Sequence, residues 1–336
     1  MVRFIVRRIL QMAGVLVALS MLLFVWLKAL PGGPVSAILG ERATPARREA
    51  LEAALGLDQP VYVQYIRFVQ RALRGDFGAS TAVIPGEDAF QVFLIRLPAT
   101  IELAICAMVL AVALGIPLGY LAARRKGSPL DSSLVVFSLI GVAVPVFFTA
   151  FLLKYFVAVE WNLLPVSGKQ DASLDATRVT GLLILDGLLT REWDAAWDAV
   201  RHLILPAVAL ATIPFAIIFR ITRASVLDTM DADFVRTAEA KGLEAKVIRS
   251  RHVLRNAMLP VVTVIGLSLG GLLAGAILTE TVFSYPGIGD AIYQSQRDKD
   301  YAVLTVLILA AAAIFVIINL LVDIAYAVLD PRIRTR

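Results

Sequence analysis

The 336-residue chain is poor in the residues on which most soluble enzymes and metal-binding proteins depend. It has one cysteine and two histidines, and only 18% of its residues are charged, against about 25% in a typical soluble domain. The single cysteine, Cys106, excludes an intrachain disulfide. His202 and His252 lie far apart with no cysteine near either, so the sequence predicts no metal site.

Motifs that bind nucleotides or nucleic acids are also missing. The phosphate-binding pattern G-x-x-x-x-G-K-[ST] does not occur, because Gly168-Lys169 is followed by Gln170 and has no glycine at the required distance upstream. The chain is therefore expected neither to hydrolyse ATP nor to hold a cofactor of its own. No groove-reading motif accompanies the net charge of +5, which argues against nucleic-acid binding. No nucleophile–base pair suggests an intramembrane enzyme.

Hydrophobic residues make up 59% of the chain and gather in blocks long enough to span about 30 Å of hydrocarbon. Segments of about ten alternating residues, which a β-barrel would need, do not recur. We therefore predict an all-α polytopic membrane protein, and interpret Pro145, Pro206 and Pro214 as kinks within its spans. The six predicted transmembrane helices lie at residues 9–30, 98–123, 132–158, 203–225, 258–280 and 302–328.

Lysine and arginine gather near both chain ends and between the fourth and fifth blocks, whereas the shorter outer loops hold few of them. Both termini are therefore predicted to be cytoplasmic. This orientation gives an N-terminal helix (1–30), an extracytoplasmic insertion (31–96), a transmembrane core (97–330) and a cytoplasmic tail (331–336).

Helical spacing and turn residues predict two helices within the insertion, at 45–55 and near 61–73. In the second outer segment, 159–200, Trp161, Trp193 and Trp197 are interpreted as interface anchors, or alternatively as a docking surface for a partner.

The cytoplasmic loop at 228–256 reads as two short helices broken at Gly242, a residue suited to a left-handed C-cap. Asp231 or Asp233 can cap the first helix, and the second is expected from about 244 to 255. Spacings of four and three put Phe234, Ala238 and Lys241 on one face of the first helix. Such a helix could dock on a partner, or the loop could lie as a basic amphipathic stretch on anionic lipid.

Polar and small residues inside the predicted spans give two further hypotheses. Asp323, in the last span, is a candidate for the transport pathway, although it could instead pair with a basic group or lie near the interface. The fifth span carries small residues four apart, which favour close helix packing, possible also against a partner chain. These residues are Gly266, Gly270, Gly271 and Gly275.

The same loop carries a resemblance to a known family. Arg236-Thr-Ala-Glu-Ala-Lys-Gly242, followed by Arg251-His252 and Leu254-Arg-Asn-Ala-Met-Leu-Pro260, resembles the cytoplasmic coupling signature of ATP-binding-cassette (ABC) importer permeases, in its dipeptide/oligopeptide version. The general signature begins Glu-Ala-Ala, and Arg236 and Thr237 depart from it here as is typical of the peptide branch. Other segments continue the resemblance in order along the chain: Arg7-Arg8, Pro31-Gly-Gly-Pro34, Leu55-Gly-Leu-Asp-Gln-Pro60, Gly115-Ile-Pro-Leu-Gly119, Leu164-Pro-Val-Ser-Gly168, Phe283-Ser-Tyr-Pro-Gly-Ile-Gly289, Asn319-Leu-Leu-Val-Asp323 and Leu329-Asp-Pro-Arg-Ile-Arg334.

The resemblance implies the first of two homologous permease subunits in a bacterial or archaeal plasma membrane. Its expected partners are a second permease, two ATPase subunits that bind ATP and Mg, an extracytoplasmic substrate-binding protein and the lipid bilayer. By analogy, the helix around Phe234–Lys241 sits in a groove of an ATPase subunit. Peptides are the implied cargo, with glutathione, a nickel complex or haem as alternatives. An ion-gradient-driven secondary transporter is the competing hypothesis, but it would need ionisable groups at the bilayer centre and an inverted repeat.

Overall fold

The computed structural model describes residues 2–29, 59–174 and 176–329, with isolated positions between 35 and 57; it does not describe the side chains of 2–6, 273–275 and 321–329. Within these residues, five helices are long and apolar enough to cross a membrane, and a bent helix pair makes a sixth if it counts as one span. The predicted all-helical, multi-pass fold class is thereby confirmed. Most of the helix expected at 45–55 lies outside the described residues. The chain forms two compact units, Met1–Pro98 with Pro286–Arg336, and Ala99–Tyr285.

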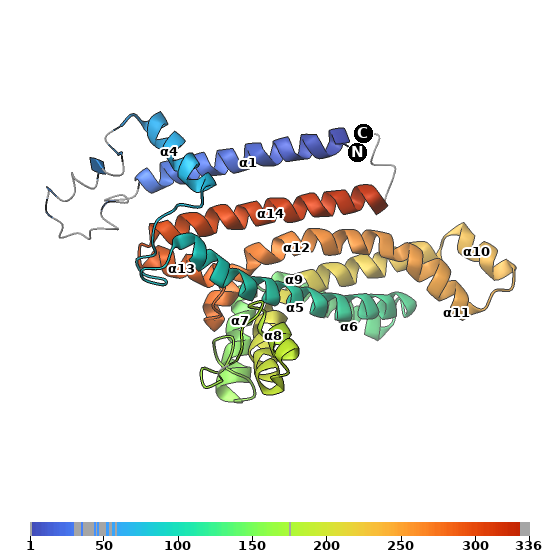
Figure 1. Ribbon diagram of the computed structural model, residues 1–336. Helices are drawn as coiled ribbons and strands as arrows, with labels where there is room; N and C mark the ends of the chain where they lie inside the picture. The colour runs from blue at the N-terminus through green and yellow to red at the C-terminus, as the bar shows by residue number, and fades with distance from the viewer. Residues whose placement is uncertain are drawn as a thin grey trace. The chain divides into compact units, whose positions relative to one another are not determined.

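In the first unit, two long apolar helices, one from each end of the chain, pack against each other and run side by side in Figure 1. A shorter helix also packs against the first of them. The helices of this unit are α1 (Val2–Ala29), α4 (Val61–Leu73), the first residues of α5 (Ala89–Arg124), α13 (Ile288–Arg297) and α14 (Tyr301–Leu329).

The helix predicted near 61–73 is confirmed as α4, and an aromatic cluster holds it on α1. The ring of Phe24 lies 5.5 Å from that of Tyr65 and 5.7 Å from that of Phe68. The Tyr65 hydroxyl also shares a 2.9 Å hydrogen bond with Ser20. Tyr65 and Phe68 are three residues apart and project from one side of α4, which is why the amphipathic pattern was visible in the sequence.

A fully buried carboxylate, Asp300, anchors the segment that precedes α5. Its Oδ2 accepts the Ser80 hydroxyl at 2.7 Å and the backbone N–H groups of Thr81, Ala82 and Val83 at 3.0–3.2 Å. Successive N–H groups converging on one anion form a backbone nest. The turn between α13 and α14 is thereby tied to residues more than 200 positions earlier in the chain.

The second unit is built around one long helix that packs against its neighbours on several sides. This helix, α9 (Trp193–Met230), continues through Pro206 and Pro214 without a break, so the interpretation of both prolines as tolerated within a span is confirmed. Around α9 are the rest of α5, α6 (Pro129–Ala143), α7 (Val146–Leu153), η1 (Lys154–Glu160), α8 (Leu183–Thr190), α10 (Asp233–Ala240), α11 (Ala245–Val247), η2 (Ile248–Leu254) and α12 (Arg255–Phe283).

Two glycines let α5 approach α9 closely. A methyl group at Gly119 would lie 2.6 Å from the carbonyl oxygen of Phe219, and one at Gly115 would lie 2.9 Å from the side chain of Ile218. The two glycines are four residues apart and so share one face of α5. They form a small-xxx-small contact of the kind that lets membrane helices pack backbone to backbone.

The third predicted span is interrupted. The sequence suggested only a kink at Pro145, but α6 ends at Ala143, Val144 is extended, and α7 with η1 leaves at 103°. Proline removes an N–H from the helix ladder and disfavours helical geometry at the residue before it. Here that restriction ends the helix outright, whereas in α9 it does not.

Candidate functional site

The chain leaves α9 for the loop at 228–256 through a single extended residue. Ala232, with φ −74° and ψ 145°, stands at the N-cap of α10 and provides no side-chain cap. The sequence-based expectation that Asp231 or Asp233 caps this helix was therefore wrong: Asp231 closes α9, and Asp233 is already inside α10. Asp233 instead lies 3.8 Å from Arg236 in an exposed ion pair, which contributes little.

The end of α10 has the predicted left-handed residue. Gly242 has φ +73°, its N–H donates to the carbonyl of Glu239, and the next N–H, of Leu243, donates to the carbonyl of Ala238. These two bonds are those of a Schellman motif. No atom would lie within 4 Å of a side chain added at Gly242, so its requirement for glycine comes from backbone conformation alone.

The inner side of α10 is apolar and buried. Val235 and Ala238 enter a cluster that joins five helical segments at one end of the second unit. The cluster consists of Ala123, Val226, Val235, Ala238, Ile248, Val253 and Ala257. Burial on this scale fixes α10 to the ends of α5, α9 and α12, so α10 is a supported element and not a free loop.

The outer side of α10 carries most of the predicted contact residues. Phe234 is 44% exposed, an unusual position for a phenylalanine, and Arg236, Thr237 and Lys241 are exposed beside it. Ala238 does not share this face as the spacing suggested, because its side chain is directed into the cluster. The exposed predicted residues are therefore one aromatic ring, one hydroxyl group and two cations, and the acidic Asp233 and Glu239 are exposed on the same helix.

The second predicted helix of the loop is present but does not end at residue 255. From the N-cap Glu244, helical geometry runs through α11 and η2 directly into α12. Arg251 is exposed and His252 is half-buried on this stretch. The second half of the loop is therefore continuous with a helix that is long and apolar enough to span a membrane.

An ion pair near the same end of the unit was missed by the sequence analysis. Arg223 of α9 donates from Nε to Oδ1 of Asp131 at 2.7 Å and from Nη2 to Oδ2 at 2.8 Å. Asp131 also accepts the N–H of Gly127, and its own N–H donates to the N-cap side chain of Ser128. The sequence Ser128-Pro-Leu-Asp131 resembles a helix-capping pattern and could have indicated an ordered aspartate here.

At the opposite end of α5 within the second unit, buried carboxylates have structural partners. Glu102 accepts the N–H groups of Leu183 and Ile184 and so caps α8, and Glu280 accepts the hydroxyl of Thr100 at 2.7 Å. Neither carboxylate is aimed at a described cavity. These partners support structural roles for both carboxylates.

Asp186, in α8, orders the loop before it. Burial acts to raise the pKa of its carboxyl, but hydrogen bonds from the hydroxyl and N–H of Thr180 and from the N–H of Gly181 outweigh that effect and hold the pKa below its ordinary value. The carboxyl is therefore ionised at neutral pH, as a capping acceptor must be.

The remaining candidate residues are not brought together. Gly270 is buried in α12, Gly266 is half-buried, and Gly271 is exposed with open space around it, while the surroundings of Gly275 lie outside the described side chains. Asp323 belongs to α14, but its side chain also lies outside the described part. Within the described residues, no group of three or more His, Cys, Asp or Glu side chains could hold a metal ion.

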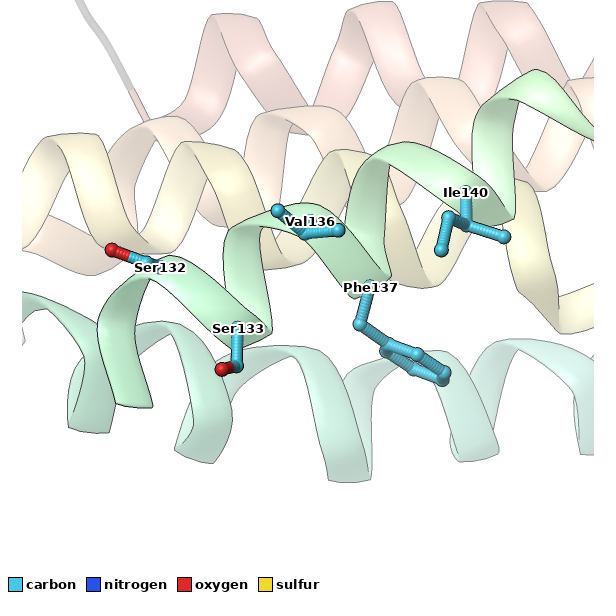
Figure 2. Close-up of a pocket in the computed structure, with 5 residues that line it drawn as sticks. All are labelled: Ser132, Ser133, Val136, Phe137 and Ile140. Carbon is cyan, nitrogen blue, oxygen red and sulfur yellow. The ribbon is translucent and has the colours of Figure 1, made fainter. Parts of the chain in front are cut away.

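One face of α6 lines an open cavity of about 400 Å³. Figure 2 shows its five lining residues on a single stretch of that helix: Ser132, Ser133, Val136, Phe137 and Ile140. Asp131 precedes the first lining residue in the sequence, but its side chain is buried against Arg223 of α9 and does not line the cavity.

Comparisons with known proteins agree along the whole chain. A family model described as "Binding-protein-dependent transport system inner membrane component" matches residues 115–335, and a model of the N-terminal part of such membrane components matches residues 1–104. The chain is 43% identical to the dipeptide transport system permease protein DppB of Escherichia coli strain K12, covering 99% of both chains.

Two further relatives bear peptide-related names. The chain is 41% identical, over 99% of both chains, to the di/tripeptide transport system permease protein DppB of Pseudomonas aeruginosa strain UCBPP-PA14. It is 37% identical to the probable D,D-dipeptide transport system permease protein DdpB of Escherichia coli strain K12, covering 97% of this chain and 94% of that relative.

Proposed function

Because the chain belongs to the family of binding-protein-dependent transport system inner membrane components, we propose that it is a permease subunit of an ABC importer for di- and oligopeptides. The observation that carries this proposal is full-length similarity to permeases named for peptide transport. The chain then forms half of a translocation pathway in the inner membrane, together with a second, homologous permease.

The energy source in this proposal is external to the chain. Two ATPase subunits bind ATP and Mg on the cytoplasmic side, and a substrate-binding protein delivers the peptide on the other side. The distribution of lysine and arginine supports cytoplasmic termini, with residues 31–96 and 159–200 outside.

Within the chain, α10 is the element that meets the ATPase. Phe234, Arg236, Thr237 and Lys241 supply the contact surface, because they are among the exposed residues of a helix whose other side is buried. Ala238 seats the helix in the cluster and Gly242 ends it at the required angle. An aromatic ring on a rigid support is the kind of anchor that dominates protein interfaces.

The neighbouring candidates keep more general roles in the proposal. Arg251 and His252 lie on the helical stretch that leads from α10 into α12, next to the ATPase surface. The α12 glycines serve helix packing, and the exposed Gly271 leaves room for a helix of the second permease. Asp323 stays a candidate for the transport pathway.

Reconstitution tests the proposal against an ion-driven carrier. Proteoliposomes that contain both permeases and both ATPases, supplied with peptide-loaded binding protein outside and ATP inside, should accumulate labelled dipeptide. Uptake should persist when protonophore and ionophores collapse all ion gradients, and should disappear when the ATPases are omitted. Uptake that follows a proton or sodium gradient without ATP would overturn the proposal. Binding assays on the partner binding protein would separate peptides from glutathione, nickel complexes or haem.

A further inference from the structure

The ion pair between Asp131 and Arg223 has the geometry of a fixed joint between two helices. Two hydrogen bonds of 2.7 and 2.8 Å join the guanidinium fork to both carboxylate oxygens. The side chain of Asp131 is 5% exposed and that of Arg223 is 27% exposed. A bidentate pair fixes orientation as well as distance, so α6 cannot slide or rotate along α9 while the pair is intact.

On one side, the joint is continuous with the element that meets the ATPase. Arg223 lies one helical turn before Val226, whose side chain packs in the same cluster as Val235 and Ala238 of α10. Ser225 adds a hydrogen bond from its hydroxyl to the carbonyl of Ala257 in α12, at 2.9 Å. A displacement of α10 is thereby passed to this end of α9.

On the other side, the ion pair holds the N-terminal end of the short helix α6. The 15-residue helix α6 starts at Pro129, two residues before Asp131, and ends at the 103° break after Ala143. Between these ends it also packs along α9: the ring of Phe137 lies 5.9 Å from that of Phe215, and a methyl group at Gly141 would lie 3.4 Å from the carbonyl oxygen of Thr212. Between these ends lies the exposed face with Ser133 and Phe137 that lines the cavity in Figure 2.

The chemistry of the ion pair also indicates that it fixes the position of α6 relative to α9 and adds little to the stability of the fold. A buried ion pair gives little net stability compared with apolar side chains of similar volume, because both charges lose their hydration. Apolar packing transmits displacement but is not directional, whereas the two charge-assisted hydrogen bonds also fix the relative orientation of α6 and α9. Ionic hydrogen bonds act in both directions, as a reciprocating transport cycle requires.

We propose that Asp131 and Arg223 are positioning residues that transmit the movement of α10 to α6, and that α6 in turn reshapes the cavity on its exposed face. This inference rests on the proposed function, since it assigns the joint a task in ATP-driven transport. Neither residue contacts the ATPase or the peptide in this scheme.

The test compares peptide transported with ATP hydrolysed in the reconstituted importer. Asp131→Asn keeps the size of the side chain and removes its charge, while Arg223→Lys keeps the charge and removes the fork. Both variants should bind the ATPases and hydrolyse ATP at near wild-type rates, yet carry at least tenfold less peptide per ATP. The charge exchange Asp131→Arg with Arg223→Asp should recover much of that ratio. Arg220→Gln is the matched control, because Arg220 donates only to a carbonyl of its own helix and should leave the ratio unchanged.

A distance measurement gives a second readout that does not depend on activity. Spin labels at Ser133→Cys on α6 and Asp228→Cys on α9, in a Cys106→Ala background, report whether the two helices move as one body. The distance should stay constant between ATP-free and ATP-bound states in the otherwise wild-type chain. With Asp131→Asn it should broaden or become dependent on ATP.

The possible outcomes distinguish a failure of the proposed role of the ion pair from a failure of the proposed function. If the wild-type complex transports peptide and Asp131→Asn keeps the wild-type ratio of peptide to ATP, the ion pair does not transmit movement. The proposed function then stands. If uptake, hydrolysis and thermal stability all fall together in both single variants, the pair is merely structural and the inference is overturned. If the wild-type complex shows no ATP-dependent peptide uptake, the proposed function fails and the inference fails with it.

Discussion

At the scale of single residues, this protein uses glycine for two different physical reasons. Gly242 is required for its positive φ and has open space around it. Gly119 has an ordinary helical backbone, but a side chain there would collide with the carbonyl of Phe219. The first reason acts through backbone strain and the second through steric overlap, so substitutions should fail in different ways.

Replacing Gly242 with valine should weaken binding of the ATPases while leaving membrane insertion intact. A β-branched residue at φ +73° costs roughly 1–2 kcal/mol, which is enough to displace the end of α10. Co-purification of the ATPases with the permease measures the effect, and Gly242→Asn should lose less because asparagine tolerates this conformation better. The matched control is Gly75→Val, which has φ +74° and equally open surroundings outside the loop. Equal co-purification in all variants would remove this loop from the coupling mechanism.

Gly119→Ala should destabilise the purified chain even without partners. Overpacking in a close helix contact costs about 1–3 kcal/mol, because α5 and α9 must separate to admit the methyl group. Thermal unfolding in detergent gives the measurement. Gly271→Ala is the control, since open space surrounds that position, and it should unfold at the wild-type temperature. The same unfolding temperature for both variants would contradict the close contact between α5 and α9.

At the scale of elements, buried carboxylates hold together segments that are distant in sequence. Asp300 fixes the residues before α5 to the turn before α14, Glu102 caps α8, and Asp131 joins α6 to α9. Each carboxylate accepts hydrogen bonds from several donors. These bonds replace the hydration that a charged group loses when it is buried. In all three cases the partner is a backbone nest, a helix N-terminus or an arginine from another element.

Asp300→Asn should loosen the segment at 80–83 specifically. Oδ2 of the carboxylate accepts four hydrogen bonds from this segment, and bonds to a charged group are worth about 1.5–3 kcal/mol each. Amide hydrogen exchange at Thr81 and Val83 should therefore speed up by about tenfold or more. Asp298→Asn, two residues away in an exposed ion pair with Arg297, should leave those amides protected. Unchanged exchange in Asp300→Asn would show that the nest does not depend on this charge.

These carboxylates also show where sequence reasoning reached its limit. Periodicity and hydropathy predicted the helical fold, α4 within its bounds, and the left-handed end of α10, because each depends on neighbouring residues. The partners of Asp131 and Asp300 lie 92 and about 220 positions away, and no local pattern encodes such distances. Proline had opposite outcomes at Pro145 and Pro206, since the neighbouring helices decide whether a span bends or breaks.

At the scale of the whole molecule, the proposed permease subunit depends on other subunits for energy and for delivery of its cargo. The chain has no phosphate-binding loop, and in its described residues it has no metal cluster. What it has is a supported helix, α10, with an exposed aromatic ring, attached to the ends of membrane helices. The competing hypothesis for this loop, a basic stretch lying on anionic lipid, predicts a different neighbour for the same ring.

Photo-cross-linking from position 234 tests whether Phe234 lies against an ATPase subunit or against lipid. p-Benzoylphenylalanine is phenylalanine with an added benzoyl group that, on illumination, inserts into C–H bonds beside it. Phe234 is 44% exposed, so this position has room for the larger side chain. With the probe at position 234, we expect a covalent adduct with an ATPase subunit. With the probe at position 137, on the exposed face of α6, we expect no adduct with the ATPases. Adducts from position 234 that contain only lipid, in a complex that still transports peptide, would contradict the account.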